Sequence, residues 1–161
     1  MPVQFTDNSI KVKAAINDTM VAWLYEAAAV IESEAARNTR VGKVGGGQTK
    51  GKWKHVVDES KMEATVGNTE ENAIWEEMGT GEYALEGKGR KGGWYIPIGD
   101  GSGQISQQVV DAYHMKVVYG KDGKKFAYTE GKKPQRMLHK AFTAKKAKII
   151  KSAQERMKGL K

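Results

Sequence analysis

The chain has 161 residues, 39% hydrophobic and 29% charged, which indicates one soluble globular domain and excludes a disordered chain. The absence of cysteine excludes disulfides, thiolate metal sites and a cysteine nucleophile. No basic start followed by an apolar core is found at the N-terminus, so no signal peptide is expected. Polar and charged residues interrupt the most apolar segment, residues 14–36, and a membrane span is therefore not expected.

The net charge of +8 is concentrated at one end of the sequence. Residues 132–161 hold eleven Lys or Arg residues against one acidic residue, Glu155, whereas residues 1–131 have a net charge of −2. This distribution suggests a polyanionic partner or an acidic face on a neighbouring subunit. A solvated helix face is the plain alternative.

A long N-terminal helix is predicted from Ala14 to Arg37, because its apolar residues recur at spacings of three and four. These residues are Ile16, Met20, Trp23, Leu24, Ala27 and Ile31. Residues 38–52 are rich in glycine and lysine without periodicity, which predicts a mobile loop.

Short strands are predicted after this loop. Residues 53–57 and 62–66 alternate apolar and polar side chains, which predicts a hairpin. A short helix over residues 70–78 ends at glycine, and a strand over residues 94–99 is expected at a sheet edge because of Pro97. A second hairpin is predicted from residues 117–119 and 126–128, with Asp122-Gly123 in its turn.

A final helix is predicted after Pro134, with Leu138, Phe142 and Ile149 on its buried stripe and continuing through Ala153 and Met157. The predicted fold class is therefore α+β. We expect a single domain, residues 1–161, in which a small, mainly antiparallel sheet of four to five strands packs against the N-terminal and C-terminal helices.

The sequence contains no recognisable catalytic motif. The three histidines are far apart without metal-ligand spacing, and no G-x-S-x-G motif occurs. Glu76 and Glu77 point about 100° apart on a helix, so they cannot face one substrate as a glycosidase pair does. A carboxylate beside a glycine turn commonly accepts backbone N–H bonds and fixes the turn. We therefore predict no enzyme, cofactor or metal, and assign Glu77, Gly79, Thr80 and Gly81 to a structural turn.

Three stretches resemble the neck, or tail-component, proteins of tailed bacteriophages. "NAIWEEMGTG" is similar to the family pattern Tyr-Ala-x-Tyr-Val-Glu-Phe-Gly-Thr-Gly, although Asn72 and Glu76 depart from it. "PQRMLHKAF" is similar to a proline followed by Phe-Leu-Arg-Pro-Ala-Phe, with His139 and Lys140 replacing Arg-Pro. "TKGKWKHVV" is a looser match to Thr-Gly-x-Leu-Arg-x-Ser-Ile.

The resemblance implies a non-enzymatic virion subunit, assembled in the host cytoplasm. Head-to-tail copies would form a ring, six- or twelve-fold, between the head connector and the tail terminator or tail tube, with a channel for DNA. Residues 83–114 would be a family-variable insertion. The resemblance also implies packing roles for Trp75 and Met78, beside the core residues expected from periodicity, Trp23, Leu24, Leu138 and Phe142.

The basic C-terminal helix leaves two interpretations open. Its lysines would contact DNA in the channel or an acidic surface on an adjacent ring, with protein contact favoured because DNA must slide. These lysines are Lys140, Lys145, Lys146, Lys148 and Lys151. The alternative function is a small basic nucleic-acid-binding module that uses Trp53 and Trp94 as stacking surfaces.

Overall fold

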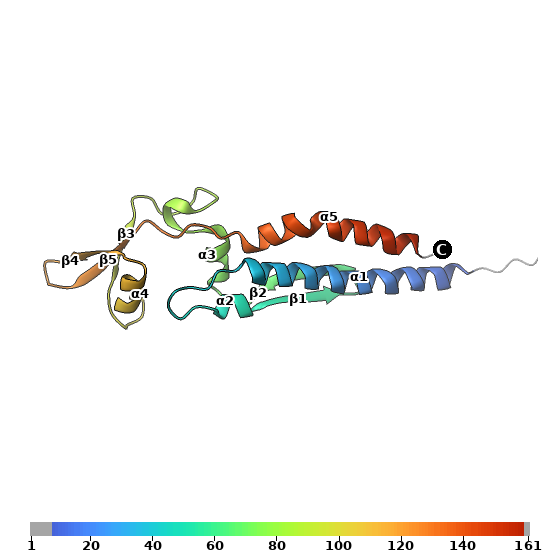
Figure 1. The fold of residues 1–161 in the computed structure, drawn as a ribbon, viewed down its shortest axis with the longest axis horizontal. Coiled ribbons are helices and arrows are strands. Elements are labelled where there is room, and N and C mark those ends of the chain that lie inside the picture. The colour runs from blue at the N-terminus through green and yellow to red at the C-terminus, as the bar shows by residue number, and fades with distance from the viewer. Residues whose placement is uncertain (1–7, 160–161) are drawn as a thin grey trace, which may run out of the picture.

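Two antiparallel helices form the long axis of the molecule. The computed structural model describes residues 8–159, and in it α1 (Ser9–Asn38) lies beside α5 (Met137–Lys158). The start of α1 and the end of α5 lie at the same end of an elongated structure (Figure 1). Both long helices were predicted, and α1 begins five residues before Ala14. Its first turns carry exposed Ile10 and Val12, which give no buried periodicity to detect.

The hairpin and α5 contact different faces of α1. Tyr25 and Glu32 lie seven residues apart and contact Glu59 and His55 of the hairpin. The α1 residues that contact α5 are Trp23, Glu26 and Glu34, which bind Ser152, Arg156 and Lys145. Because α-helical residues advance about 100° each, these two sets project in different directions. Helix α1 therefore contacts α5 on one side and the hairpin on another (Figure 1).

The first hairpin is antiparallel and has the predicted position. Strands β1 (Trp53–Asp58) and β2 (Glu63–Asn68) pair with Val56 opposite Thr65. Trp53 is buried, and its indole N–H donates to the buried Thr39 hydroxyl at 2.8 Å. A short helix, α2 (Gln48–Gly51), lies inside the predicted loop 38–52. The mobility of that loop stays a prediction.

A second sheet lies at the opposite end of the long axis from the start of α1 (Figure 1). Its strands are β3 (Trp94–Pro97), β4 (Lys116–Tyr119) and β5 (Lys125–Thr129), in the antiparallel order β3-β5-β4. Strand β3 is at an edge, as Pro97 predicted. Helix α4 (Gln107–Ala112) was not predicted, and the Ser106 side chain accepts from the backbone N–H of Val109 at its start.

The α+β class is confirmed, and the five strands divide into two sheets instead of one. The distal sheet draws on the predicted insertion 83–114, which supplies β3 and α4. The remaining short elements are α3 (Ala73–Met78) and a 3-10 turn, η1 (Gly81–Tyr83). They connect the two ends of the molecule.

The principal core is small and lies where α1, β1 and α5 meet. Its buried members are Ile31, Ala35, Trp53, Met137 and Ala141. Trp23, Leu24 and Leu138 were predicted to be core residues, and all three are half-buried. The prediction for Phe142 is wrong, since it is 53% exposed. Met137 and Ala141 occupy the face toward α1, and Phe142 is turned about 100° away from Ala141.

The chain exposes more surface than a compact monomer of its size. Its accessible area is 11716 Å², whereas about 8000 Å² is expected for 17.7 kDa. The nine residues outside the described range are too few to account for the difference. Helices long and apolar enough to cross a membrane are absent from residues 8–159.

Candidate functional site

Glu77 caps α5 from a distant part of the chain. Its Oε2 accepts from the backbone N–H of Leu138 at 2.9 Å, and its Oε1 accepts from that of His139 at 3.0 Å. The residue before α5, Arg136, has left-handed backbone angles and makes no side-chain cap. The first N–H groups of a helix lack internal partners and favour negative charge. Glu77 therefore supplies both the acceptor atoms and the charge that this helix end needs.

Glu76 binds the residues just upstream of α5. Its carboxylate pairs with the Lys132 ammonium and accepts from the Gln135 side-chain amide. Its backbone carbonyl also accepts from the backbone N–H of Gln135 at 2.7 Å. The two neighbouring glutamates thus point to different parts of one segment, residues 132–139. Each of the four carboxylate oxygens accepts a hydrogen bond from this segment.

The Gly79–Gly81 turn runs beside residues 130–132. Thr80 donates its backbone N–H to the Lys132 carbonyl at 2.9 Å, and its hydroxyl accepts from the Lys132 N–H at 2.9 Å. A Cβ on Gly81 would lie 2.2 Å from the Glu130 carbonyl oxygen, and one on Gly131 would lie 2.1 Å from that of Thr80. Both glycines have positive φ. Close backbone approach therefore requires glycine on both sides.

These contacts correct one part of the prediction for this corner. Glu77 does accept backbone N–H bonds, but from α5 and not from the glycine turn. The turn is held by Thr80 and by its neighbour segment. Lys132, Gln135 and Gly131 were missed, because they lie about fifty residues from the turn and no local pattern marks them.

Trp75 and Met78 differ in burial. Met78 is half-buried, whereas Trp75 is 56% exposed, so a core role for Trp75 is wrong. The buried residue of α3 is Ala73, two positions away. A six-residue helix presents one narrow face, and the small alanine occupies it. Trp75 instead lines an open groove.

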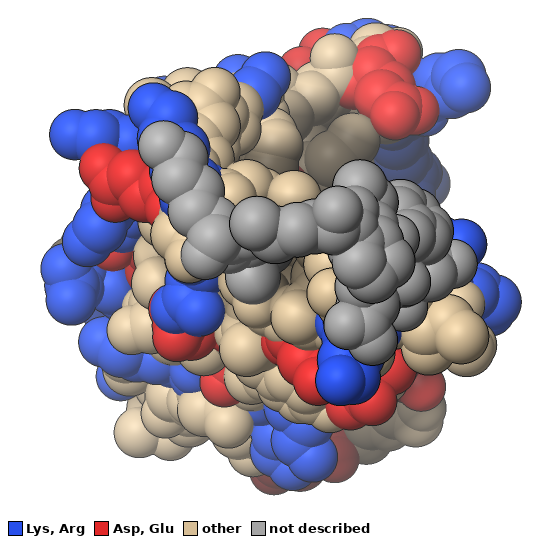
Figure 2. All heavy atoms as spheres, turned by 90° about the vertical axis from the view of Figure 1, so that its right-hand side faces the viewer, with Lys and Arg blue, Asp and Glu red and all other residues tan. Residues whose placement is uncertain are grey.

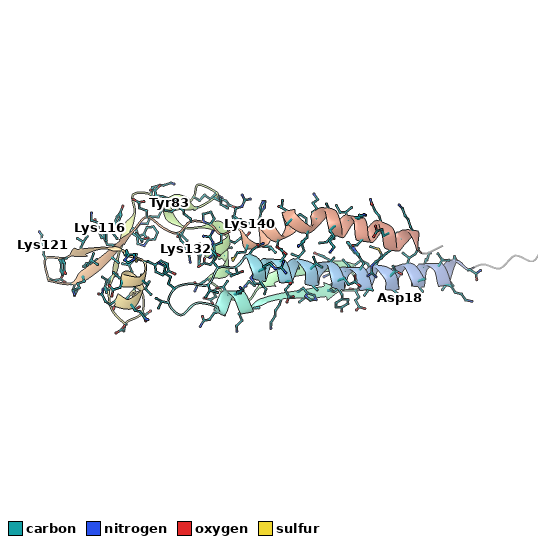
Figure 3. All side chains as sticks on the ribbon, in the orientation of Figure 1. Asp18, Tyr83, Lys116, Lys121, Lys132 and Lys140 are labelled. Atoms are coloured by element: carbon teal, nitrogen blue, oxygen red, sulfur yellow. The ribbon has the colours of Figure 1, made fainter. Side chains whose placement is uncertain are left out.

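This groove, of about 1590 Å³, lies between the loop 39–49 and the start of the distal sheet. Aromatic and basic residues share its walls. Lys43 lies 5.6 Å from the Tyr113 ring centre, and Lys133 lies 5.5 Å from that of Tyr83. Figure 3 places Tyr83 and Lys132 between Lys140 at the start of α5 and Lys116 of the distal sheet, with Lys121 at the outer end of that sheet.

Two ionisable groups near the groove have perturbed acidity. The Tyr83 hydroxyl donates to Glu130 at 3.2 Å, which raises the pKa of Tyr83. The Gly92 N–H, followed by the Lys91 ammonium, lowers the pKa of Glu82. Both shifts are those of ordinary surface hydrogen bonds. Neither creates a proton acceptor or donor suited to neutral pH.

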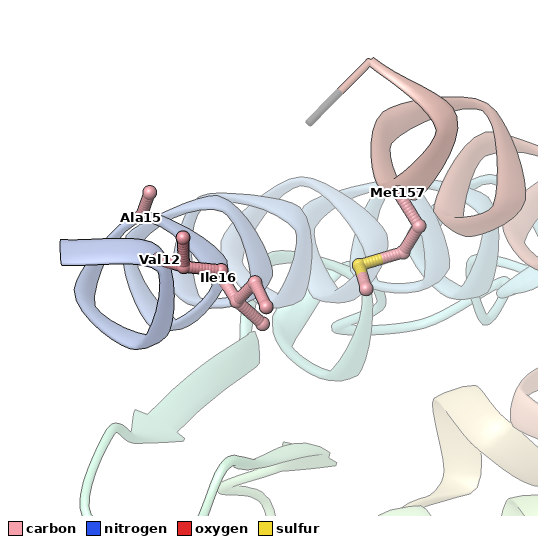
Figure 4. A pocket seen from close by; sticks show the side chains of 4 residues that line it. All are labelled: Val12, Ala15, Ile16 and Met157. Carbon is pink, nitrogen blue, oxygen red and sulfur yellow. The ribbon is translucent and has the colours of Figure 1, made fainter. Parts of the chain in front are cut away.

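A second, smaller cavity of about 260 Å³ lies between the start of α1 and the end of α5. Its four lining residues, Val12, Ala15, Ile16 and Met157, are all apolar, and Met157 extends toward α1 (Figure 4). Met157 itself is 43% exposed, so the predicted buried stripe of α5 ends before it. Figure 2 shows this end of the molecule, with Lys and Arg spread around its edge.

The five predicted contact lysines of α5 separate into two groups. Lys145 pairs with Glu34 at 3.0 Å, and Lys151 lies 3.8 Å from Glu155. Lys140, Lys146 and Lys148 are exposed, and no carboxylate in the described part of the chain pairs with them. Part of the basic excess is therefore neutralised internally. The other three lysines face solvent.

Stacking by Trp53 is excluded by its burial, and Trp94 is half-buried with Arg90 over its ring at 5.5 Å. His55 is half-buried, while His114 and His139 are exposed. Across residues 8–159, no group of three or more His, Asp or Glu residues is arranged to bind a metal. Comparison with known protein families, curated proteins and solved structures found no match.

Proposed function

We propose that the chain is a structural subunit of a tailed-bacteriophage neck, which joins the head connector to the tail as a ring around a DNA channel. The observation that carries the assembly role is the accessible area, 11716 Å² against about 8000 Å² for a compact monomer. A chain with so small a core and so large a surface gains stability by burying that surface against other chains.

The assignment to the neck rests on the residue patterns of 72–81 and 134–142. In both, the matching residues occupy the corner where α3 meets α5. Glu77 of the first pattern binds the backbone of Leu138 and His139 in the second. This pairing gives a physical reason for two distant patterns to occur in one chain. It supports the resemblance without depending on catalysis.

A non-catalytic role fits the same corner. Both glutamates are engaged by backbone or side-chain partners, and Glu77 lies at a helix end instead of the floor of a deep cleft. The groove beside it is wide and open. We propose no reaction for it.

Coexpression with the connector, tail terminator and tail-tube proteins encoded by neighbouring genes tests this function. The expected result is a ring-shaped complex by negative-stain microscopy that contains this chain. The chain alone should be a monomer or a weak oligomer. A tight dimer that binds none of these proteins would overturn the proposal.

A nucleic-acid-binding module is the second candidate, and the groove favours it. Exposed Trp75, Tyr83 and Tyr113 lie there among Lys43 and other basic residues. Aromatic rings and lysines together suit single-stranded nucleic acid. Glu76 and Glu130 in the same lining oppose it. The measurement that separates the two candidates is the salt dependence of DNA affinity.

A further inference from the structure

Helix α5 and the β1–β2 hairpin are the outer layers of the helical half, and each has an uncovered side. Val56, on the side of the hairpin away from α1, is 70% exposed, beside exposed Thr65. On α5, Ile150 is 46% exposed, with Lys140 and Lys146 also facing solvent. A two-stranded hairpin that is covered on only one face has marginal stability by itself. Both layers therefore have apolar side chains that a neighbour could bury.

The charges of these two sides are opposite. On the outer side of α5, Lys140 and Lys146 have no ion-pair partner within residues 8–159. Lys148 projects about 160° away from Lys146 and lies on another side of the helix. On the outer side of the hairpin, the acidic residues Asp58 and Glu63 lie opposite each other at the ends of the paired strands. Glu63 is exposed at the start of β2 and Glu71 is exposed three residues after its end, and no cation pairs with either in the described residues. Lys54 is the basic residue on the same side of the hairpin.

We propose that the outer face of α5 in one copy of this chain covers the outer face of the β1–β2 hairpin in the next copy. Ile150 would lie against Val56, and the lysines of α5 would lie near Glu63 and Glu71. Since the two faces lie on different sides of α1, the contact is head-to-tail and each copy keeps one free face of each kind. Such heterologous contacts propagate and close into a ring when the rotation fits.

The occupant is a second copy because both halves of the contact are present on one chain and complement each other in charge. Complementary charge favours the correct pairing over like-with-like pairing. Two α5 faces brought together would place lysines against lysines. The inference deepens the proposed ring and rests on it for the idea that copies assemble.

Cysteine cross-linking tests the contact, since the native chain has no cysteine. Val56→Cys and Ile150→Cys are combined in one full-length chain and treated with a short bis-maleimide. We expect a ladder of covalent dimers, trimers and larger species on a denaturing gel. Cross-linking within one chain leaves a monomer band and is therefore distinguished from a ladder. Each single variant should remain monomeric.

Three further variants test the specificity of the contact. A chain with Tyr119→Cys and Ile150→Cys has two exposed sites on unrelated surfaces and should give no ladder. Lys140→Glu with Lys146→Glu should weaken the Val56–Ile150 ladder at least several-fold, and adding Glu63→Lys with Glu71→Lys should restore it. Dimers from Ile150→Cys alone, or a double variant no better than the Tyr119 control, would overturn the proposed contact.

The experiments distinguish a failure of the proposed contact from a failure of the proposed neck function. A missing ladder in a chain that still binds connector and tail proteins overturns the interface and leaves the neck proposal in place. A ladder in a chain that binds neither protein supports the interface and overturns the neck proposal.

Discussion

Glu77 and Leu138 are 61 residues apart in sequence, yet the carboxylate of the first accepts the backbone N–H of the second at 2.9 Å. The bond places a negative charge at the first turn of α5 and fixes where that helix starts. It also connects α3 to the helix that carries the basic surface. A side chain outside α5 therefore helps to fix its start, beside the contacts that α5 makes with α1.

Replacing Glu77 with Ala should lower the free energy of unfolding by about 1 to 2 kcal/mol, the usual effect of losing a helix cap. Glu77→Gln should lower the free energy of unfolding by less, because its amide oxygen can still accept one of the two hydrogen bonds. Urea unfolding followed by circular dichroism measures both. Glu71→Ala is the matched control, since Glu71 is exposed on the same segment. Equal stability of the Glu77→Ala and Glu71→Ala chains would contradict the capping role.

The glycines of the corner give a second comparison. Gly131 and Gly87 both have positive φ, but a Cβ meets the Thr80 carbonyl oxygen at 2.1 Å at Gly131 and open space at Gly87. Gly87→Ala should cost about 1 to 2 kcal/mol from backbone conformation alone. Gly131→Ala should lower the free energy of unfolding by clearly more, because the backbone at Thr80 must also move. Thermal unfolding of the two variants measures this difference. Similar melting temperatures would argue against the close approach of Gly131 to Thr80.

Much of the fold could be predicted from local pattern, and the site only in part: the glycine turn and a backbone-binding Glu77 were predicted, but their partners were not. The periodicities of α1 and α5 and the Asp122-Gly123 turn signal are local, so these elements were found. The partners of Glu76 and Glu77 follow from tertiary packing, which no spacing in the sequence records. Periodicity also placed Phe142 on the buried stripe with Leu138. The structure uses Ala141 there, since a small side chain lets α5 approach α1 closely.

This difference between Phe142 and its neighbours is measurable. Met137 is fully buried, so Met137→Ala should lower the free energy of unfolding by about 2 to 5 kcal/mol. Phe142→Ala removes a larger side chain, yet it should cost much less in the isolated chain because Phe142 is already exposed. Chemical unfolding of the monomer at low concentration gives both values. A larger loss for Phe142→Ala would mean that Phe142 belongs to the core.

The Glu34–Lys145 pair makes stability depend on pH. The Lys145 ammonium, donating to Glu34 at 3.0 Å, lowers the pKa of Glu34 from its usual 4.5. A lowered folded-state pKa stabilises the fold above the usual value, and this contribution is lost as pH falls through the folded-state value. Glu34→Gln should therefore be less stable than the native chain near about pH 7 and equal to it near about pH 2.

Unfolding curves at the two pH values check this, with Glu63→Gln as the control. Glu63 is exposed and has no cation beside it in the described residues, so its replacement should leave the pH profile unchanged. A Glu34→Gln deficit that persists unchanged at low pH would assign the loss to packing instead of charge.

The salt dependence of DNA binding separates the neck subunit from the nucleic-acid module. Three unpaired lysines on α5 can neutralise at most three phosphates, which limits the slope of log affinity against log salt to about 3 for duplex DNA. We expect affinity weaker than micromolar, a slope no steeper than this, and loss of binding when Lys140, Lys146 and Lys148 become Ala. Submicromolar affinity with a steeper slope, reduced by Lys43→Ala and Lys133→Ala in the groove, would instead support the nucleic-acid module. Fluorescence anisotropy with labelled single- and double-stranded DNA over a salt series measures all of these.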